Sequence, residues 1–242
     1  MPVPDNSQGV RINRYLSAAG FCSRRQADGL IASGVVTIDD QKAEIGSRVQ
    51  NGQIVKVNGQ PVVTLENNIY VLLYKPVGIT CTTDPRRRDN IVDYLGFEER
   101  IFPVGRLDRD SEGLILLTND GSIVNRMLRQ HNKHEKEYRV TVDKPVTQTF
   151  LEQMASGVPI LNTVTRPCKI WREQDTVFRI ILTQGLNRQI RRMCEACGYT
   201  VKRLIRVRIM HLTIDSMRPG DWRYLTPREL KVLKGQLQNS VS

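Results

Sequence analysis

The sequence contains no long apolar segment and no leader of the secretory type. Its longest apolar runs, at residues 70–74 and 114–117, are far shorter than the roughly 18 residues that span a bilayer. Residues 1–9 contain neither a basic stretch nor the apolar stretch that would follow it in a secretory signal. We therefore predict a cytoplasmic protein with no membrane contact, and we interpret the short apolar runs as buried strands.

Cysteine and histidine are too few and too scattered for a disulfide framework or a metal centre. The five cysteines are an odd number at irregular spacing, which fits a reducing compartment. Cys194 and Cys197 form a CxxC pair, but no second pair stands at zinc-finger spacing. His131 and His134 have no third ligand in view. The sequence therefore predicts free thiols and no metal.

Basic residues exceed acidic ones. The chain has 36 lysines and arginines against 25 acids, a net charge of +11 and a pI near 9.7, above the value of about 9 that marks nucleic-acid binders. Residues 1–68 are nearly balanced, with seven basic and six acidic side chains, so the excess lies in the C-terminal part. A polyanionic partner, with nucleic acid favoured over an acidic lipid surface, is the first hypothesis.

The chain divides into two predicted domains of the α+β class between a short tail at 1–9 and another at 236–242. In the first, at 10–68, Gly20 suits the end of one short helix and Ser23 suits the N-cap of a second over 24–33. Strands are indicated at 35–38 and 54–57. These elements predict a compact α+β unit.

The second domain, at 69–235, has more predicted strands than helices. Strands are indicated at 69–74, 113–118, 138–142, 177–183 and 205–214, and helices at 122–129, 147–156, 189–197 and 226–234, the last one closed by Gly235. Few segments alternate as β-α-β, which favours a mixed, mainly antiparallel sheet. The polar tail at 236–242 is predicted to fray.

One charged loop precedes the apolar strand at 113–118. Residues 105–113 hold three acids and two arginines between Gly105 and Gly113, and Asp108 follows Gly-Arg-Leu. Catalytic groups often occupy polar loops joined to buried strands. The pattern of the loop by itself leaves an ordinary charged turn equally open.

Two further segments could hold RNA. The window 188–208 contains seven basic residues against one acid, beside a helix whose apolar positions are spaced for a core face. Clustered cations repel one another unless an anion neutralises them, so phosphate binding is favoured over a merely solvated face. In the strand at 138–142, alternation places Tyr138 with Val140 and Val142. Tyr138 is therefore a core residue or an aromatic platform for an unstacked base.

Taken together, these segments show that the chain resembles the RsuA/RluB/RluE/RluF family of bacterial rRNA pseudouridine synthases, with an N-terminal S4-type RNA-binding domain. The resemblance covers about residues 10–235. Its motifs are residues 10–16 and 22–25 in the S4-like (αL) part and 73–78, 105–108, 136–138 and 188–192 beyond it. Residues 135–145 and 187–195 are most similar to the RluF branch.

The resemblance implies an isomerase that breaks the C1′ to N1 bond of a uridine in RNA and forms a C1′ to C5 bond. No atoms are exchanged, so no cofactor, metal or second substrate is expected. Asp108 would be the essential carboxylate, acting either as nucleophile or as base for a sugar proton. Arg191 would pair with Asp108 and keep it ionised. Tyr138 would stack on the uracil.

The resemblance also implies which residues contact RNA. Arg106 would fill the gap left by the flipped nucleotide, since the enzyme cannot reach a stacked base. Many synthases of the wider superfamily have His in place of Arg188, a difference that bears on RNA contacts. The remaining expected RNA-binding residues are Arg192, Lys75, Arg11, Arg14, Arg24 and Arg25. The expected substrate is 23S rRNA, with a tRNA as a second candidate, and a monomer is expected.

Two other functions compete with this one. A non-catalytic RNA-binding or ribosome-assembly protein would use the same basic residues, yet a carboxylate among cations that face phosphates would weaken its affinity. A metal-dependent RNA hydrolase using Asp108 and Asp110 would lose activity in EDTA. The trio of Asp108, Tyr138 and Arg191 favours the synthase.

Overall fold

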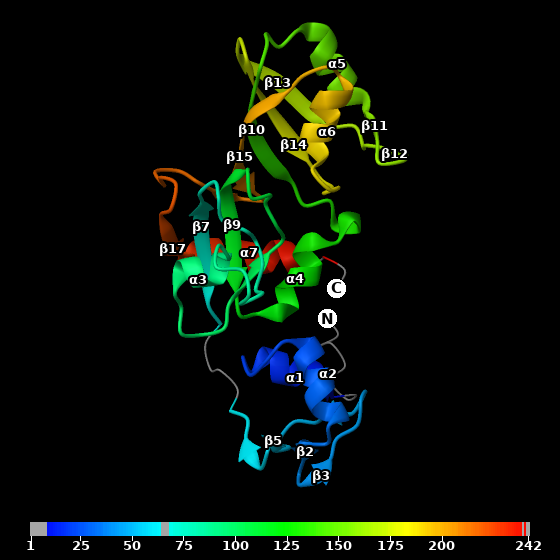
Figure 1. Cartoon of the computed structure of the whole chain (residues 1–242), viewed down its shortest axis with the longest axis vertical. Helices are drawn as coiled ribbons and strands as arrows, with labels where there is room; N and C mark the ends of the chain where they lie inside the picture. The colour runs from blue at the N-terminus through cyan, green and yellow to red at the C-terminus, as the bar shows by residue number, and fades with distance from the viewer. Residues whose placement is uncertain (1–8, 64–67, 239, 241–242) are drawn as a thin grey trace. The chain divides into compact units, whose positions relative to one another are not determined.

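The computed structural model of the protein describes residues 9–63, 68–238 and 240, which divide into two compact units (Figure 1). One unit comprises the chain up to Ile69 with Phe97–Ile101 and Asn119–Gly121, and the other comprises the rest. The smaller unit packs around one hydrophobic core and the larger around two. Residues 1–8 of the predicted tail at 1–9 lie outside the described residues. None of the helices in these ranges has the length and apolarity to cross a membrane.

The smaller unit pairs two helices with two small sheets. Its elements are β1 (Val10–Arg11), α1 (Ile12–Ala18), α2 (Arg24–Ala32), β2 (Val36–Ile38), β3 (Gln41–Lys42), β4 (Arg48–Val49), β5 (Val55–Val57) and β6 (Gln60–Pro61). The order of the larger sheet is β3-β2-β5-β6, and β1 pairs with β4. Ile12 and Leu16 of α1 and Ile31 of α2 are buried against the sheet residues Val36 and Val55.

Local capping explains where α2 begins. The Ser23 side chain accepts a hydrogen bond from the Gln26 main-chain N–H at 3.2 Å, and the Gln26 side chain accepts one from the Ser23 N–H at 2.9 Å. This reciprocal capping box confirms the predicted N-cap, which is typically worth about 1 kcal/mol. Gly20 has φ +76°, the left-handed conformation predicted for the end of the first helix.

The larger unit is built on one nine-stranded sheet. Its strands are β7 (Tyr70–Lys75), β8 (Phe102–Val104), β9 (Glu112–Thr118), β10 (Lys136–Val142), β13 (Lys169–Gln174), β14 (Val177–Leu182), β15 (Val201–Ile209), β16 (Leu212–Thr213) and β17 (Trp222–Tyr224), with β11 (Pro159–Ile160) and β12 (Thr163–Val164) as a separate hairpin. Its helices are α3 (Ile91–Leu95), α4 (Gly121–Leu128), α5 (Gln148–Ser156), α6 (Gln189–Ala196) and α7 (Pro227–Gln238), with a 3-10 turn at Gln130–Asn132.

The sheet confirms the predicted mixed, mainly antiparallel α+β architecture. The main path runs β13-β14-β10-β15-β9-β7-β17, with β16 on β15 and β8 on β9. Neighbours pair antiparallel except β15 and β9, which pair in parallel over only Ile205 with Glu112 and Arg206 with Gly113. The edge strands β13 and β17 and the short elements β8 and α3 were not predicted.

The parallel junction separates the two cores of this unit. On one side, α5 and α6 cover β10 and β14, as Figure 1 shows, and bury residues such as Phe150, Phe178 and Met193. On the other side, α4 and α7 pack against β7 and β9 around Leu72 and Leu116. The hydrogen-bonded sheet is therefore continuous, but its buried side chains belong to two separate cores, which meet near β15.

The end of α7 contradicts two predictions. Gly235 lies inside the helix, which continues to Gln238, so the expected stop at Gly235 and the frayed start of the tail at 236–238 are wrong. Leu233 and Leu237, four residues apart, are 0% and 1% exposed. Burial of two leucines outweighs the cost of about 1 kcal/mol for a glycine within a helix. The tail residues 239, 241 and 242 lie outside the described residues.

Candidate active site

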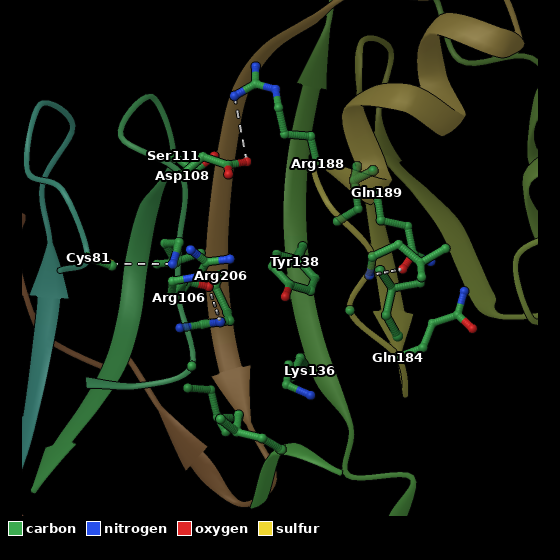
Figure 2. Close-up of a pocket in the computed structure, with 18 of the residues that line it drawn as sticks. Cys81, Arg106, Asp108, Ser111, Lys136, Tyr138, Gln184, Arg188, Gln189 and Arg206 are labelled. Carbon is green, nitrogen blue, oxygen red and sulfur yellow. Dashed lines mark hydrogen bonds and ion pairs between the residues drawn. The ribbon is translucent and has the colours of Figure 1, made fainter. Parts of the chain in front are cut away.

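A pocket of about 570 Å³ opens in the larger unit where its two cores meet. Its walls come from the loop after β8, from β10 and β15, and from the segment that leads into α6 (Figure 2). Among the described residues that line the pocket, Asp108 is the only carboxylate. Five cations line it as well: Arg106, Arg109, Lys136, Arg188 and Arg206. The pocket is therefore strongly positive around a single acid.

The main chain holds Asp108 in place from both sides. Gly105 turns the chain out of β8 with φ +81°, a conformation that glycine adopts readily. The Leu107 N–H donates to the Cys81 sulfur at 3.4 Å, and the Ser111 N–H donates to the Asp108 carbonyl at 3.1 Å. Figure 2 shows the Asp108 side chain extending from this loop toward Arg188, with 34% of the side chain exposed. The carboxylate is thus positioned and still accessible.

The cation that faces Asp108 is Arg188, not Arg191 as predicted. Arg188 Nη1 lies 3.8 Å from Asp108 Oδ2, and the Arg188 guanidinium also donates to both Asp110 oxygens at 3.1 and 2.9 Å. Arg191 donates instead to the Asp110 carbonyl at 3.0 Å and to Ser111 Oγ at 3.2 Å. Arg188 precedes α6 in the left-handed conformation, whereas Arg191 lies almost one turn further along the helix and reaches the start of β9.

The two acids of the loop therefore have different surroundings. The hydrogen bond from Arg188 is the largest cause that lowers the pKa of Asp110, with burial opposing it and the charge of Arg191 adding to it. Among the described residues, the Asp108 carboxylate has only the looser ion pair with Arg188, at 3.8 Å. Asp110 therefore holds Arg188 and Arg191 in place. The Asp108 carboxylate is bound less tightly, so its oxygens can approach a reacting atom.

Tyr138 lies in the middle of the pocket wall. It lies on β10, opposite Arg206 of β15 and Ile180 of β14, and it packs partly against the core around α6. The predicted alternation is confirmed, because Val140 and Val142 are 0% and 3% exposed. Tyr138 is the partly exposed member of this face and lines the pocket, as Figure 2 shows.

Lys136 and Arg206 are pocket cations that the sequence analysis did not single out. Burial, with the charge of Arg206 as the second cause, lowers the pKa of Lys136 to about 8. Arg206 is 3% exposed; its Nε donates to the Leu114 carbonyl at 2.7 Å and its Nη1 to the Arg106 carbonyl at 3.4 Å. Arg206 thus ties β15 to the loop of Asp108. Alternation from Tyr138 could have predicted the position of Lys136.

The other predicted residues of this unit divide into three groups. Arg106 lines the pocket next to Asp108 (Figure 2). Arg192 does not, and its guanidinium donates to the carbonyl and the side-chain oxygen of Asn187. Lys75 was predicted to bind RNA, but it is 0% exposed and its ammonium donates to the carbonyls of Pro76 and Ile79. Its position at the end of the buried strand β7 turns it inward, so that prediction is wrong.

In the smaller unit, the four expected RNA-binding arginines lie on the surface. Arg11 directly precedes α1, and Arg14 belongs to it, while Arg24 and Arg25 open α2, and all four are exposed. Their contact with RNA remains a prediction.

The cysteines are placed apart from one another or within the core. All five are free thiols, and Cys194 is buried on the inner face of α6. Burial raises the pKa of Cys194, so the thiol stays protonated. Within the described ranges, no three His, Cys, Asp or Glu side chains are grouped so that they could hold a metal ion.

The model of the family described as RNA pseudouridylate synthase matches residues 69–196, and the S4 domain model matches residues 10–55. The chain belongs to the RNA pseudouridylate synthase family. The synthase is 52% identical over 242 residues to the dual-specificity RNA pseudouridine synthase RluF of Escherichia coli strain K12, covering 99% of this chain and 83% of that protein. It is 34% identical over 233 residues to the ribosomal large subunit pseudouridine synthase B of Bacillus subtilis, covering 93% and 95% of the two chains.

A solved structure supports the same assignment. The crystal structure of a pseudouridylate synthase superposes with a TM-score of 0.68 at 26% identity and covers 93% of this synthase and 100% of that chain. The synthase is an isomerase that acts on uridine in RNA, with an S4 domain in front. The resemblance identified from the motifs is thereby confirmed, and the hypotheses of a non-catalytic binder and of a metal-dependent hydrolase are set aside.

Proposed function

We propose that the synthase isomerises a specific uridine of 23S rRNA, accepts a tRNA uridine as a second substrate, and acts as a monomer in the cytoplasm. The observation that carries the proposal is the identity of 52% over nearly the whole chain to a relative named as dual-specificity. The large-subunit synthase of Bacillus subtilis, similar over 93% of the chain, supports the rRNA target. The single carboxylate among five pocket cations fits an RNA substrate.

Asp108 starts the reaction. It attacks C1′ as a nucleophile or removes a sugar proton as a base, and in either route the C1′ to N1 bond breaks with its electron pair moving onto the uracil. The uracil turns within the pocket and C5 bonds to C1′. In the nucleophile route the bond from Asp108 to C1′ breaks at this step, and in the base route Asp108 returns the proton to the sugar. The C5 proton then leaves and N1 gains a proton. Atoms and electrons balance without an external reactant. Arg188, which faces Asp108 at 3.8 Å, places a positive charge beside the reacting carboxylate.

The pocket walls hold the displaced base. Tyr138 supplies the aromatic surface on which the uracil stacks, and Arg106 fills the space in the RNA from which the nucleotide has flipped. Lys136 and Arg206 place two positive charges beside the site where the released uracil carries its negative charge. Arg191 acts indirectly, because it holds Asp110 and Ser111 next to Asp108.

Mapping pseudouridine in RNA tests the target. Cells that lack the synthase should lose pseudouridine at one 23S rRNA position and at one tRNA position, and a plasmid copy should restore both. Loss at the tRNA position alone would contradict the rRNA target. Complete modification in both RNAs without the synthase would contradict the whole proposal.

Binding to RNA should weaken steeply with salt. The exposed pocket arginines Arg106, Arg109 and Arg188, together with the exposed arginines of the smaller unit, can neutralise several phosphates. Release of the counterions then lowers affinity by roughly 10³-fold or more between 50 and 200 mM salt if six or more phosphates are contacted. Filter binding of a 23S rRNA transcript over this salt range measures the slope, and an affinity independent of salt would argue against the basic surface as the binding site.

A further inference from the structure

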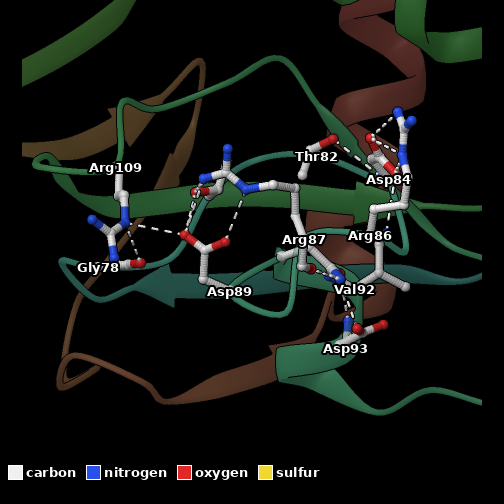
Figure 3. A network of polar contacts seen from close by, with 11 residues as sticks. Gly78, Thr82, Asp84, Arg86, Arg87, Asp89, Val92, Asp93 and Arg109 are labelled. Carbon is white, nitrogen blue, oxygen red and sulfur yellow. Dashed lines mark hydrogen bonds and ion pairs between the residues drawn. The ribbon is translucent and has the colours of Figure 1, made fainter.

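A second loop, for which the sequence predicted no function, adjoins the loop of Asp108. Residues 78–90, here called the rim loop, connect β7 to α3 and contribute Thr80 and Cys81 to the lining of the pocket. Figure 3 shows its side chains joined by a network of ion pairs. Arg86, Arg87 and Arg88 are consecutive and exposed. The loop that contributes to the pocket wall therefore also carries three adjacent exposed cations.

The rim loop is fastened to the loop of Asp108 at several points. The Gly78 N–H donates to the Arg109 carbonyl at 2.8 Å, and Arg109 Nε donates back to the Gly78 carbonyl at 3.1 Å. Arg109 Nε also lies 3.0 Å from Asp89 Oδ2. Together with the hydrogen bond from Leu107 to Cys81, these contacts give the arginines a defined place beside the pocket.

Carboxylates orient part of this cluster. The Arg86 guanidinium and main-chain N–H donate to the Asp84 carboxylate, the shortest hydrogen bond being 2.7 Å, and these contacts lower the pKa of Asp84 to about 2. Asp89 lies 3.2 Å from Arg87 and is shared with Arg109. Hydrogen bonds from Arg87 and then from Thr80 hold the pKa of Asp89 well below its usual range. Both acids stay ionised, so each holds an arginine side chain by an ion pair.

The charges of the cluster do not balance. Four arginines, Arg86, Arg87, Arg88 and Arg109, stand against two carboxylates, and Arg88 has no ion-pair partner in the part of the chain that the structure describes. Exposed ion pairs of this kind are screened by solvent and contribute little to stability. The rim loop itself therefore has a net charge of +1, and together with Arg109 the cluster has a net charge of +2.

A second network of ion pairs in the larger unit, which serves only the fold, has equal numbers of acids and arginines. On the face of β10 opposite Tyr138, three acids pair with three arginines, so the charges cancel. The members of that network are Glu135, Glu137, Glu173, Arg139, Arg179 and Arg208. Balance is expected where ion pairs serve only the fold, and an uncompensated excess at a pocket edge is expected where an anion arrives from outside.

We propose that Arg86 and Arg88 of the rim loop, with Arg87 and Arg109 beside them, clamp backbone phosphates of the RNA strand next to the flipped uridine. The inference rests on RNA as the substrate and adds the residues that grip it beside the pocket. Arginine suits this task because its planar guanidinium donates two parallel hydrogen bonds to a phosphate. Because phosphates carry no base identity, the clamp positions the strand and does not select the sequence.

A double variant tests the clamp. R86Q/R88Q removes two exposed charges, and its matched control R172Q/R228Q removes two exposed arginines from β13 and α7 that do not line the pocket. Filter binding of a 23S rRNA transcript at several salt concentrations gives the slope of log affinity against log salt. The clamp variant should lose roughly 1.5 to 2 from the magnitude of this slope, and the control should lose nothing.

Kinetics on the same transcript, labelled with tritium at C5 of uridine, separate binding from chemistry. KM should rise about tenfold at 0.15 M salt in R86Q/R88Q while kcat stays within twofold, and R86K/R88K should recover the salt slope. Equal slopes in the clamp variant and the control would overturn the proposal. A fall in kcat with unchanged KM would overturn it as well. If the wild type does not modify the transcript, the proposed 23S rRNA target is wrong. The salt slopes of the clamp variant and the control still test the clamp in that case.

Discussion

Asp108→Asn is expected to bind RNA as tightly as the wild type and to release no measurable tritium from C5-labelled uridine. Asparagine has nearly the shape of aspartate, but it is neither a nucleophile nor a base. Loss of a general base costs on the order of 10²- to 10⁴-fold, and loss of a nucleophile costs more. Binding should persist or improve, because one negative charge is removed from a pocket lined by five cations.

Asp110→Asn is the matched control for this result. Asp110 is two residues away and holds Arg188 in a bidentate ion pair, but it does not line the pocket. Its replacement should reduce kcat by roughly tenfold through a misplaced Arg188 and leave turnover measurable. If Asp108→Asn kept its activity, or if Asp110→Asn were the inactive variant, the assignment of the catalytic carboxylate would be wrong.

Gly113→Ala is expected to destabilise the larger unit and to reduce activity together. Gly113 has φ +110°, and a Cβ built on it would lie 2.5 Å from the main-chain nitrogen of Arg206 and closer still to the Arg206 carbonyl oxygen. The contact lies at the parallel junction of β9 and β15. Backbone strain and overpacking each cost about 1–3 kcal/mol, so a loss of about 2–6 kcal/mol follows.

The effect on activity arises because Arg206 holds the Arg106 carbonyl next to Asp108. Thermal unfolding measures the stability, and a melting point lower by about 4 °C or more is expected for a chain of this size. Gly235→Ala is the control, since Gly235 lies within α7 and a Cβ there meets nothing within 4 Å. That variant should be about 0.5–1 kcal/mol more stable. A Gly113→Ala protein as stable as the wild type would contradict the close approach of β15.

Short-range patterns in the sequence predicted much of the fold. Ser23 as an N-cap marks the start of α2, and alternation at Tyr138 and Val140 shows which face of β10 is buried. Spacing within residues 189–197 likewise places the buried side of α6. Each of these features depends on residues within one or two turns of a helix or a few positions of a strand, so the sequence alone contains it.

Longer-range features were predicted less well. The edge strands β13 and β17 carry exposed residues and lack the apolar runs that identified the central strands. Gly235 resembles a helix stop until the burial of Leu237 is known. The cluster of four arginines and two acids forms only when the fold brings Arg109 to Asp89 of the rim loop.

By itself, the sequence determined the class of the fold, the family and the identity of Asp108 as the acid of interest. Only the tertiary structure decided that Arg188 faces Asp108, that Arg191 holds Asp110 and that Lys75 is buried. The loop of Asp108 and helix α6 are far apart in the chain, since Arg188 and its ion-pair partner Asp110 are separated by 78 positions. Ion pairing falls off over a few ångströms, so the choice between neighbouring arginines depends on how β9, β15 and α6 pack, and local sequence patterns do not specify that packing.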